Sequence, residues 1–215
     1  MINKITTHML KFDKEKHEYS VGNKKVLSVT TVLPDIPEHL IYKQFFIDAT
    51  HRGTRVHEHV DTINKYYIKK NKILSSDLCS NCLETDKPYV NSYIKFLKAH
   101  RPEMLLSEKK MFHTELFYAG TVDLVAVIKG KLSILDVKTT TKIAPYAKLQ
   151  LAAYVYMYNF CYPERKAFNR YIIHLQEKNY RLVPYTVKTL EDDFEIFQCK
   201  LKSAQWDAGN LSKYK

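Results

Sequence analysis

Apolar and polar positions follow two different periods along the chain, and together they predict strands alternating with helices. Short apolar runs bounded by glycine, proline or charged residues are typical of strands, whereas apolar positions three or four apart are typical of helices. The predicted strands span 17–21, 24–27, 104–113, 120–128, 131–139, 167–176 and 180–187. The predicted helices span 38–49, 51–67, 88–100 and 145–160, and a last helix begins near 190. This order predicts an α/β fold in which a central mixed β-sheet is flanked by helices, with an N-terminal helical elaboration.

Two helical stripes indicate which helix faces are buried. The first consists of Val56, Val60, Ile63 and Tyr67, and the second of Leu190, Phe194, Phe197 and Leu201. Because such a stripe packs one side of a helix against a core, we expect His57 and Arg52, beside the first stripe, to face a cleft.

The length and composition fit one compact domain. The chain has 215 residues, of which 45% are hydrophobic, and this is enough to bury a sizeable core. We expect a single domain over 1–215, with a hairpin and helices in 1–103, the sheet core in 104–187 and a C-terminal helix in 188–215. The segment 68–86 contains many small polar residues and reads as a connection or a small insertion.

The charge and hydropathy of the chain indicate which kinds of molecule it can bind. Lysine and arginine number 34 against 23 aspartate and glutamate residues, so the formal charge is +11. This excess favours a polyanion such as nucleic acid, although lysines also serve as solvated surface. The start of the chain lacks the apolar segment of a secretory signal, and no apolar run has the length of a membrane span. We therefore expect a soluble cytoplasmic protein with no membrane partner.

Two acids occupy positions where a carboxylate is costly. Asp123 lies within an apolar strand, and Asp136 follows a run that is apolar on both faces. A lone buried carboxylate loses several kcal/mol or more of hydration, so it is tolerated when it is paired or bound to a metal. Gly130 supports a tight turn between the two strands, which places the acids on neighbouring antiparallel strands.

The spacing of Asp136 and Lys138 indicates a possible chemistry. Side chains two apart on a strand point to the same face and can act on one substrate atom. Hard oxygen ligands favour magnesium or manganese, and a neighbouring ammonium can orient water, which are the parts that phosphodiester hydrolysis needs. The alternative is a structural ion pair within one strand.

These residues resemble the PD-(D/E)XK nuclease superfamily, which has a restriction-endonuclease-like core, and in particular its RecB-like exonuclease branch. That branch includes phage exonucleases and a mitochondrial genome-maintenance exonuclease. The resemblance extends from about Tyr19 to Tyr154, although Val122 stands where the family often has proline. Gln150 and Tyr154, one helical turn apart, resemble the helix that follows the catalytic strand.

Upstream segments extend the resemblance. The segment from Arg52 to Glu58, with Gly53 and His57, is similar to the branch's glycine-x-x-x-histidine helix, whose histidine supplies a metal ligand. The segment 27–34 is similar to the serine-valine-threonine stretch that opens many of these nucleases. Glu108 matches an acid on the strand before the first aspartate.

The resemblance implies a role for each residue. A magnesium or manganese ion would be held by His57, Asp123, Asp136 and the backbone carbonyl of Val137. Lys138 would position water, Gln150 and Tyr154 would support the lysine or the DNA strand, and Glu108 would belong to the catalytic site. The candidate phosphate contacts are Arg52, Arg55, Lys142 and Lys148.

Simpler interpretations exist for several of these residues. His57 could be a solvated or hydrogen-bonded helix histidine, since the chain has nine histidines. Glu108 could be an exposed strand residue, and Gln150 and Tyr154 could simply pack or cap.

The cysteines do not match an iron–sulfur site. Cys79 and Cys82 have metal-ligand spacing, but Cys161 and Cys199 are isolated, and the cysteine trio that follows the core in cluster-binding relatives is absent. We predict free thiols and no iron–sulfur cluster.

The sequence therefore predicts a metal-dependent DNA exonuclease that leaves 5′-phosphates and acts in recombination, repair or replication. The resemblance places it in a phage or bacterial host cell, with a recombination or replication protein as a further partner. Two alternatives stay open, namely an endonuclease of the same superfamily and a DNA-binding module that has lost catalysis.

Overall fold

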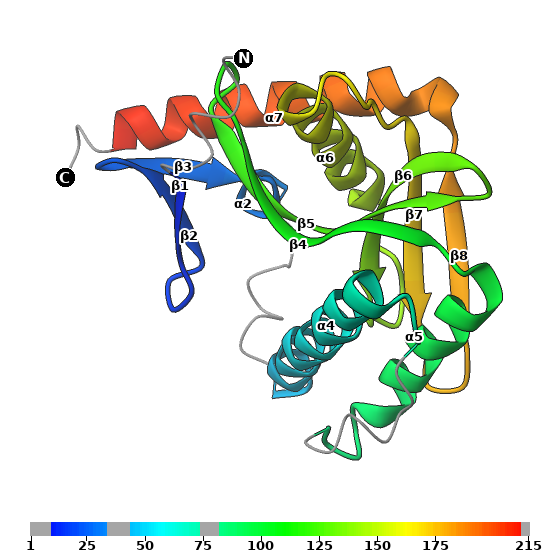
Figure 1. Ribbon diagram of the computed structural model, residues 1–215. Coiled ribbons are helices and arrows are strands. Elements are labelled where there is room, and N and C mark those ends of the chain that lie inside the picture. The colour runs from blue at the N-terminus through cyan, green and yellow to red at the C-terminus, as the bar shows by residue number, and fades with distance from the viewer. Residues whose placement is uncertain (1–9, 34–43, 74–81, 212–215) are drawn as a thin grey trace.

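The computed structural model describes residues 10–33, 44–73 and 82–211, and its strands form one eight-stranded mixed sheet with helices on both faces (Figure 1). The strands are β1 (Leu10–Asp13), β2 (Glu18–Val21), β3 (Lys24–Ser28), β4 (Glu103–His113), β5 (Tyr118–Ile128), β6 (Lys131–Lys138), β7 (Asn169–Leu175) and β8 (Tyr180–Tyr185). The helices are α2 (Val29–Val32), α4 (Gln44–Lys70), α5 (Lys87–His100), α6 (Ala147–Cys161) and α7 (Leu190–Leu211), with a 3-10 turn η2 (Val187–Thr189). The predicted fold class is confirmed.

One side of β5 has a gap between its two partner strands. Strand β4 pairs antiparallel along β5 from Tyr118 to Val127, so it occupies one edge. The other edge is shared, since β3 pairs in parallel with Tyr118 and Ala119, and β6 pairs antiparallel from Leu124 onward. Residues 120–123 of β5 lie between these two partners and pair with neither of them. Asp123 lies in this gap.

Two hydrophobic cores hold the helices against the sheet. Helices α6 and α7 cover one face with α2, and α4 and α5 cover the other (Figure 1). The predicted stripes are buried, because Val56 and Val60 of α4, and Phe194 and Phe197 of α7, are at most 5% exposed. Burying such side chains stabilises the fold by about 1.5–3 kcal/mol each.

Local signals fix several element ends. The turn between β5 and β6 consists of Lys129 and Gly130, both with positive φ, as a tight hairpin turn requires. Helix α5 ends at His100, where Arg101 adopts the left-handed conformation before Pro102, as predicted.

Other boundaries differ from the prediction. The break expected between 49 and 51 is wrong, because α4 runs without interruption from Gln44 to Lys70. No proline occurs in that stretch, and Gly53 lies within the helix without breaking it, so the i to i−4 hydrogen bonds continue. Residues 38–43 of the predicted first helix lie outside the described residues. Strand β1 and the short helix α2 were not predicted. The division of the chain into 1–103, 104–187 and 188–215 stays a prediction.

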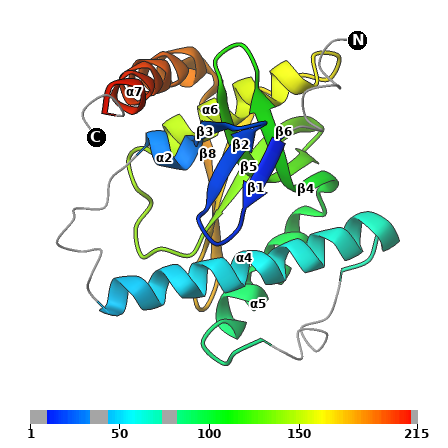
Figure 2. The same ribbon diagram turned by 90° about the vertical axis from the view of Figure 1, so that its left-hand side faces the viewer.

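Strands β1, β2 and β3 form an antiparallel unit at the side of the main sheet, called here the N-terminal hairpin. Its buried face, with Tyr19 and Val26, packs against Phe112 and Ala119. Figure 2 shows the turn between β1 and β2 directed toward α4, where Lys14 forms an ion pair with Glu58 at 3.1 Å. The hairpin therefore contacts α4 directly beside His57. Among the helices in the described ranges, none has both the length and the apolar character that crossing a membrane requires.

Candidate metal and hydrolytic site

Three side chains from distant parts of the chain converge at the gap in the sheet. His57 of α4, Glu108 of β4 and Asp123 of β5 each offer a ligand atom, and these atoms all lie within 4.8 Å of one another. Nδ1 of His57 lies 3.5 Å from Oε1 of Glu108 and 3.5 Å from Oδ2 of Asp123. Imidazole and carboxylate donors at such separations can hold a divalent cation. These three residues are called the metal-candidate group.

The backbone of Val137 on β6 orients this group. Its N–H donates to Oδ2 of Asp123 at 2.8 Å, and its carbonyl oxygen lies 3.0 Å from Nε2 of His57. Each ring nitrogen of His57 therefore faces an oxygen atom. Contacts of this kind fix the orientation and tautomer of a metal-binding histidine.

Glu108 has an unusual backbone conformation. Its φ is 45°, which is rare for a residue other than glycine, and such strain persists where neighbouring structure holds it. The neighbouring Ser107 donates to Asp61 at 2.9 Å and accepts from Asn64 at 3.1 Å. Asn64 in turn accepts from Tyr93 at 2.5 Å, and both of these residues are fully buried. This network joins α4, α5 and β4 directly beside Glu108.

A second cluster lies on β6 and α6. Lys138 lies 2.8 Å from Oδ2 of Asp136 and donates to Oε1 of Gln150 at 3.1 Å. Gln150 donates to Oδ1 of Asp136 at 3.0 Å and to the hydroxyl of Tyr154 at 3.2 Å. Oδ2 of Asp136 is buried and contacts the ammonium, but within the described residues it receives no hydrogen bond of good geometry. These four residues are called the acid–lysine group.

Helix α6 reaches this position because β5 carries a glycine opposite it. A Cβ at Gly120 would lie 2.9 Å from a ring carbon of Tyr154 and 3.3 Å from Met157. Such a contact is too short, so a larger residue would push α6 away from β5. Gly120 therefore sets how closely Tyr154 and Gln150 approach the strands.

The buried acids of the site require positive charge close to them. Burial lowers the pKa of His57, but the carboxylates of Asp123 and Glu108 outweigh it and raise that pKa to about 9. Burial raises the pKa of Asp136 to about 6, against the lowering effect of the Lys138 ammonium. Burial lowers the pKa of Lys138, but Asp136 and Asp123 outweigh it and raise that pKa above its usual value. Protonated His57 and Lys138 therefore balance the acids, and a dication would fit the same charge requirement.

The residues predicted to contact phosphate have different partners in the structure. Arg55 makes two hydrogen bonds to Asp86, at 2.7 and 2.9 Å, and Asp86 is fully buried. A phosphate contact by Arg55 stays a prediction, and it would have to leave the pairing with Asp86 intact, because a buried carboxylate left unpaired is costly. The guanidinium of Arg52 lies 4.9 Å from the ring centre of Tyr89, so this arginine packs on an aromatic face.

The two lysines predicted to contact phosphate also have different surroundings, since one is paired with an acid and the other is exposed. Lys148 forms an ion pair with Asp193 at 3.2 Å. Lys142 is exposed in the loop between β6 and α6, and only its backbone carbonyl has a hydrogen bond, from Thr140, among the described residues.

The sequence interpretation missed two features beside the site. The first is the Asp61, Asn64 and Ser107 network; Asp61 and Asn64 follow His57 by four and seven positions, and this helical spacing was available as a signal. The second is the contact between the hydroxyls of Tyr19 and Thr121 at 2.5 Å, which no local pattern indicated.

The cysteine prediction concerns a segment that is only partly described. Cys82 is buried, Cys161 is half-buried and Cys199 is exposed, and Cys161 and Cys199 are free thiols. Cys79 lies outside the described residues, so the question of a paired cysteine site with Cys82 stays a prediction.

Comparisons with known proteins give distant structural likeness. No protein-family model matches the chain, and no curated protein is significantly similar to it. The crystal structure of a candidate exonuclease from Eubacterium rectale is similar with a TM-score of 0.46 and 11% identity, over 71% of this chain and 65% of that one. The chain thus spans less than two thirds of that protein. The crystal structure of SSO0001 is similar with a TM-score of 0.29 and 14% identity, over 66% of this chain and 73% of that one.

Proposed function

We propose that the protein is a metal-dependent deoxyribonuclease that hydrolyses phosphodiester bonds. The observation that carries the proposal is the convergence of His57, Glu108 and Asp123 within 4.8 Å, next to the Asp136 and Lys138 pair. Nitrogen and oxygen donors of this kind suit magnesium or manganese. The formal charge of +11 supports a nucleic acid as the substrate.

Each group has a task in this proposal. His57, Glu108 and Asp123 would hold the cation, which supplies polarisation of a phosphoryl oxygen when it is bound. Asp136 is a further candidate ligand, since its Oδ2 receives no well-aligned hydrogen bond in the described part of the chain.

Lys138 stays protonated, because Asp136 raises its pKa, and its ammonium would orient water and stabilise negative charge on the phosphate. Gln150 bridges Asp136 and Lys138 and fixes their separation. Tyr154 stays neutral, because burial raises its pKa, and would support Gln150. The carbonyl of Val137 keeps His57 in its orientation.

The finer proposal is an exonuclease that leaves 5′-phosphates in DNA recombination, repair or replication. It rests on the resemblance to the RecB-like branch in the order of His57, Asp123, Asp136, Lys138 and Gln150. An endonuclease of the same superfamily would use the same residues, so only the substrate distinguishes the two activities.

The test uses end-labelled linear duplex, single strand and closed circular DNA with magnesium or manganese. The exonuclease proposal predicts release of mononucleotides or short products from linear DNA, and an intact circle. Cutting of the circle would identify an endonuclease. Asp136→Ala and Lys138→Ala should abolish either activity, with Lys202→Ala, a change of an exposed lysine on α7, as the matched control. Undiminished cutting by an Asp136 or Lys138 variant, or absence of cutting by the unaltered protein with either metal, would refute the proposal.

A further inference from the structure

His174 on β7 is a buried polar residue to which the proposed function gives no role. Its side chain is 3% exposed, and the register of the two strands pairs it with Lys138 on β6. Paired residues of neighbouring strands point to the same face of a sheet, and Lys138 bonds to Gln150 of α6. His174 therefore lies beside Lys138 on the face that α6 covers, and Figure 1 shows β6 and β7 side by side there.

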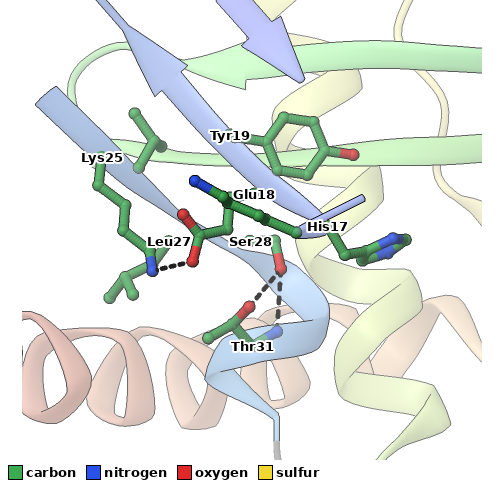
Figure 3. Close-up of a pocket in the computed structure, with 9 residues that line it drawn as sticks. His17, Glu18, Tyr19, Lys25, Leu27, Ser28 and Thr31 are labelled. Carbon is green, nitrogen blue, oxygen red and sulfur yellow. Dashed lines mark hydrogen bonds and ion pairs between the residues drawn. The ribbon is translucent and has the colours of Figure 1, made fainter. Parts of the chain in front are cut away.

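The two ring nitrogens of His174 have different surroundings. Nε2 lies 2.6 Å from the carbonyl oxygen of Thr140, and since a carbonyl only accepts, Nε2 carries the hydrogen. Nδ1 is buried and has no hydrogen-bond partner among the described residues. By contrast, charged side chains at the pocket in Figure 3 pair with each other, as Lys25 does with Glu18. A buried polar atom without a partner is unfavourable, so an apolar residue would suit this place better unless the bond to Thr140 has a task.

The segment 139–146 joins β6 to α6 and is called here the β6–α6 loop. Its first residue, Thr139, is buried, and a Cβ at Gly53 of α4 would lie 3.5 Å from the Thr139 hydroxyl oxygen. Gly53 precedes His57 by four positions, so the two residues share one face of α4. The β6–α6 loop therefore starts beside the metal-candidate group.

The next residues of the β6–α6 loop are exposed, yet their backbone is held from within the protein. Thr140, Thr141 and Lys142 are all exposed. The carbonyl of Thr140 accepts from His174, and the Thr140 hydroxyl donates to the carbonyl of Lys142 at 2.9 Å. His174 thus fixes the turn from which the Lys142 side chain projects.

We propose that His174 is a positioning residue for DNA binding, which holds the β6–α6 loop so that Lys142 meets a phosphate of the strand bound at the metal-candidate group. The inference rests on the proposed function, and it names the residue that sets the place of one phosphate contact. Contacts of this kind fix the register of a nucleic acid on a protein. His174 itself does not touch the strand, because its side chain is buried.

The test compares two changes of His174. His174→Leu keeps a similar size but offers no donor to Thr140, whereas the amide of His174→Gln can donate to the same carbonyl. Affinity is measured by fluorescence anisotropy on labelled oligonucleotides in EDTA, at several salt concentrations. His174→Leu should weaken binding about three- to fivefold, and His174→Gln less than about twofold. Equal losses for the two variants would overturn the positioning role.

Leu175→Ala is the structural control. Leu175 is buried on the other face of β7, in the core that packs against α4 and α5, so its truncation destabilises the fold without removing a contact to the β6–α6 loop. Its affinity for DNA should change less than about twofold. A loss as large as that of His174→Leu would overturn the inference, because it would reflect destabilisation alone.

A double variant shows whether His174 acts through Lys142. Lys142→Gln alone should weaken binding about five- to tenfold and reduce the salt slope by about one, as expected for one phosphate contact. Adding His174→Leu should then have almost no further effect, because the contact that His174 positions is already lost. Losses that multiply would show that the two residues act independently and would overturn the proposal.

Steady-state kinetics separates this inference from the proposed activity. With magnesium, His174→Leu should raise KM about three- to fivefold and change kcat less than about twofold, since Asp136 and Lys138 keep their own hydrogen bonds. A fall in kcat at unchanged KM would contradict a role in binding. Coupling between His174 and Lys142 in a protein that binds DNA without cutting it would refute the proposed activity and leave the positioning role standing.

Discussion

The metal-candidate group and the acid–lysine group meet at one gap in the sheet, yet they are assembled in different ways. Asp136, Lys138, Gln150 and Tyr154 come from consecutive elements, β6 and α6, and are mostly buried. His57, Glu108 and Asp123 come from α4, β4 and β5, and the His57 and Glu108 side chains are each 29% exposed. The first group is therefore set by local spacing, and the second by tertiary packing. We therefore expect the two groups to have different roles. The more exposed metal-candidate group would bind the cation, and the buried acid–lysine group would supply a fixed acid and ammonium.

The largest expected effect is that of Lys138→Ala, which should lower the rate of hydrolysis but leave the affinity for manganese nearly unchanged. Lys138→Ala should reduce hydrolysis by about 10³-fold, since an ammonium that stabilises developing charge is lost. The same change should alter manganese affinity by less than about threefold, because Lys138 is not a ligand. Initial rates on labelled DNA and calorimetric titration with manganese measure the two quantities. Thermal unfolding of the variant checks the fold, because Asp136 loses its partner. A Lys138 variant whose manganese affinity falls as much as its rate of hydrolysis would contradict the assignment of different roles to the two groups.

Changes in the metal-candidate group should show the opposite pattern. Asp123→Asn should weaken manganese binding at least about 100-fold, because a full charge close to the ion is lost in a partly desolvated site. Glu108→Gln should weaken it in the same direction. The amides are nearly isosteric with the acids, so the fold should be retained. Unchanged manganese affinity in Asp123→Asn would place the ion elsewhere.

A smaller effect is expected from the network that holds Glu108. Ser107→Ala removes the hydroxyl that joins Asp61 to Asn64 beside the strained backbone of Glu108. Manganese affinity should fall about tenfold, as is common when an outer-shell partner is removed. Lys65→Ala is the matched control, since Lys65 pairs with Asp61 from the exposed side. If both variants bind manganese as the unaltered protein does, the network has no positioning role.

The smallest effect on activity at neutral pH is expected at His113, which supports α6 at its far end. Its ring stacks on Phe160 of α6, with ring centres 4.0 Å apart, and burial lowers its pKa to about 4. The unfolded chain binds this proton near pH 6.5, so between about pH 6.5 and 4 it binds more protons than the folded chain, and stability falls with falling pH. At pH 5 the loss is on the order of 2 kcal/mol.

Urea unfolding at several pH values should show a smaller loss below pH 6.5 in His113→Asn, which keeps a hydrogen-bond acceptor near Leu116. Parallel pH profiles for the variant and the unaltered protein would contradict this assignment.

The difference between the two groups also explains what the sequence could predict. The hairpin at Lys129 and Gly130, the end of α5 before Pro102 and the stripe of α7 depend on local signals, and the structure has them at the expected places. The spacing of Asp136 and Lys138 on a strand, and of Gln150 and Tyr154 on a helix, likewise predicted which side chains meet.

Long-range pairings carried no such signal. The position of Glu108 beside His57 depends on how β4 pairs with β5 and how α4 packs on both. The ion pair of Arg55 on α4 with Asp86, the residue before α5, was likewise not predicted, because nothing in the local pattern connects the two residues. The exact composition of a site assembled from several elements was therefore beyond a reading of spacing alone.

The most direct test of a divalent cation at the metal-candidate group is a crystal structure of the protein soaked with manganese, with anomalous scattering recorded near the manganese absorption edge. The account predicts one strong anomalous peak within about 2.5 Å of ligand atoms of His57, Glu108 and Asp123. A peak at another place, or no peak at saturating manganese, would contradict it.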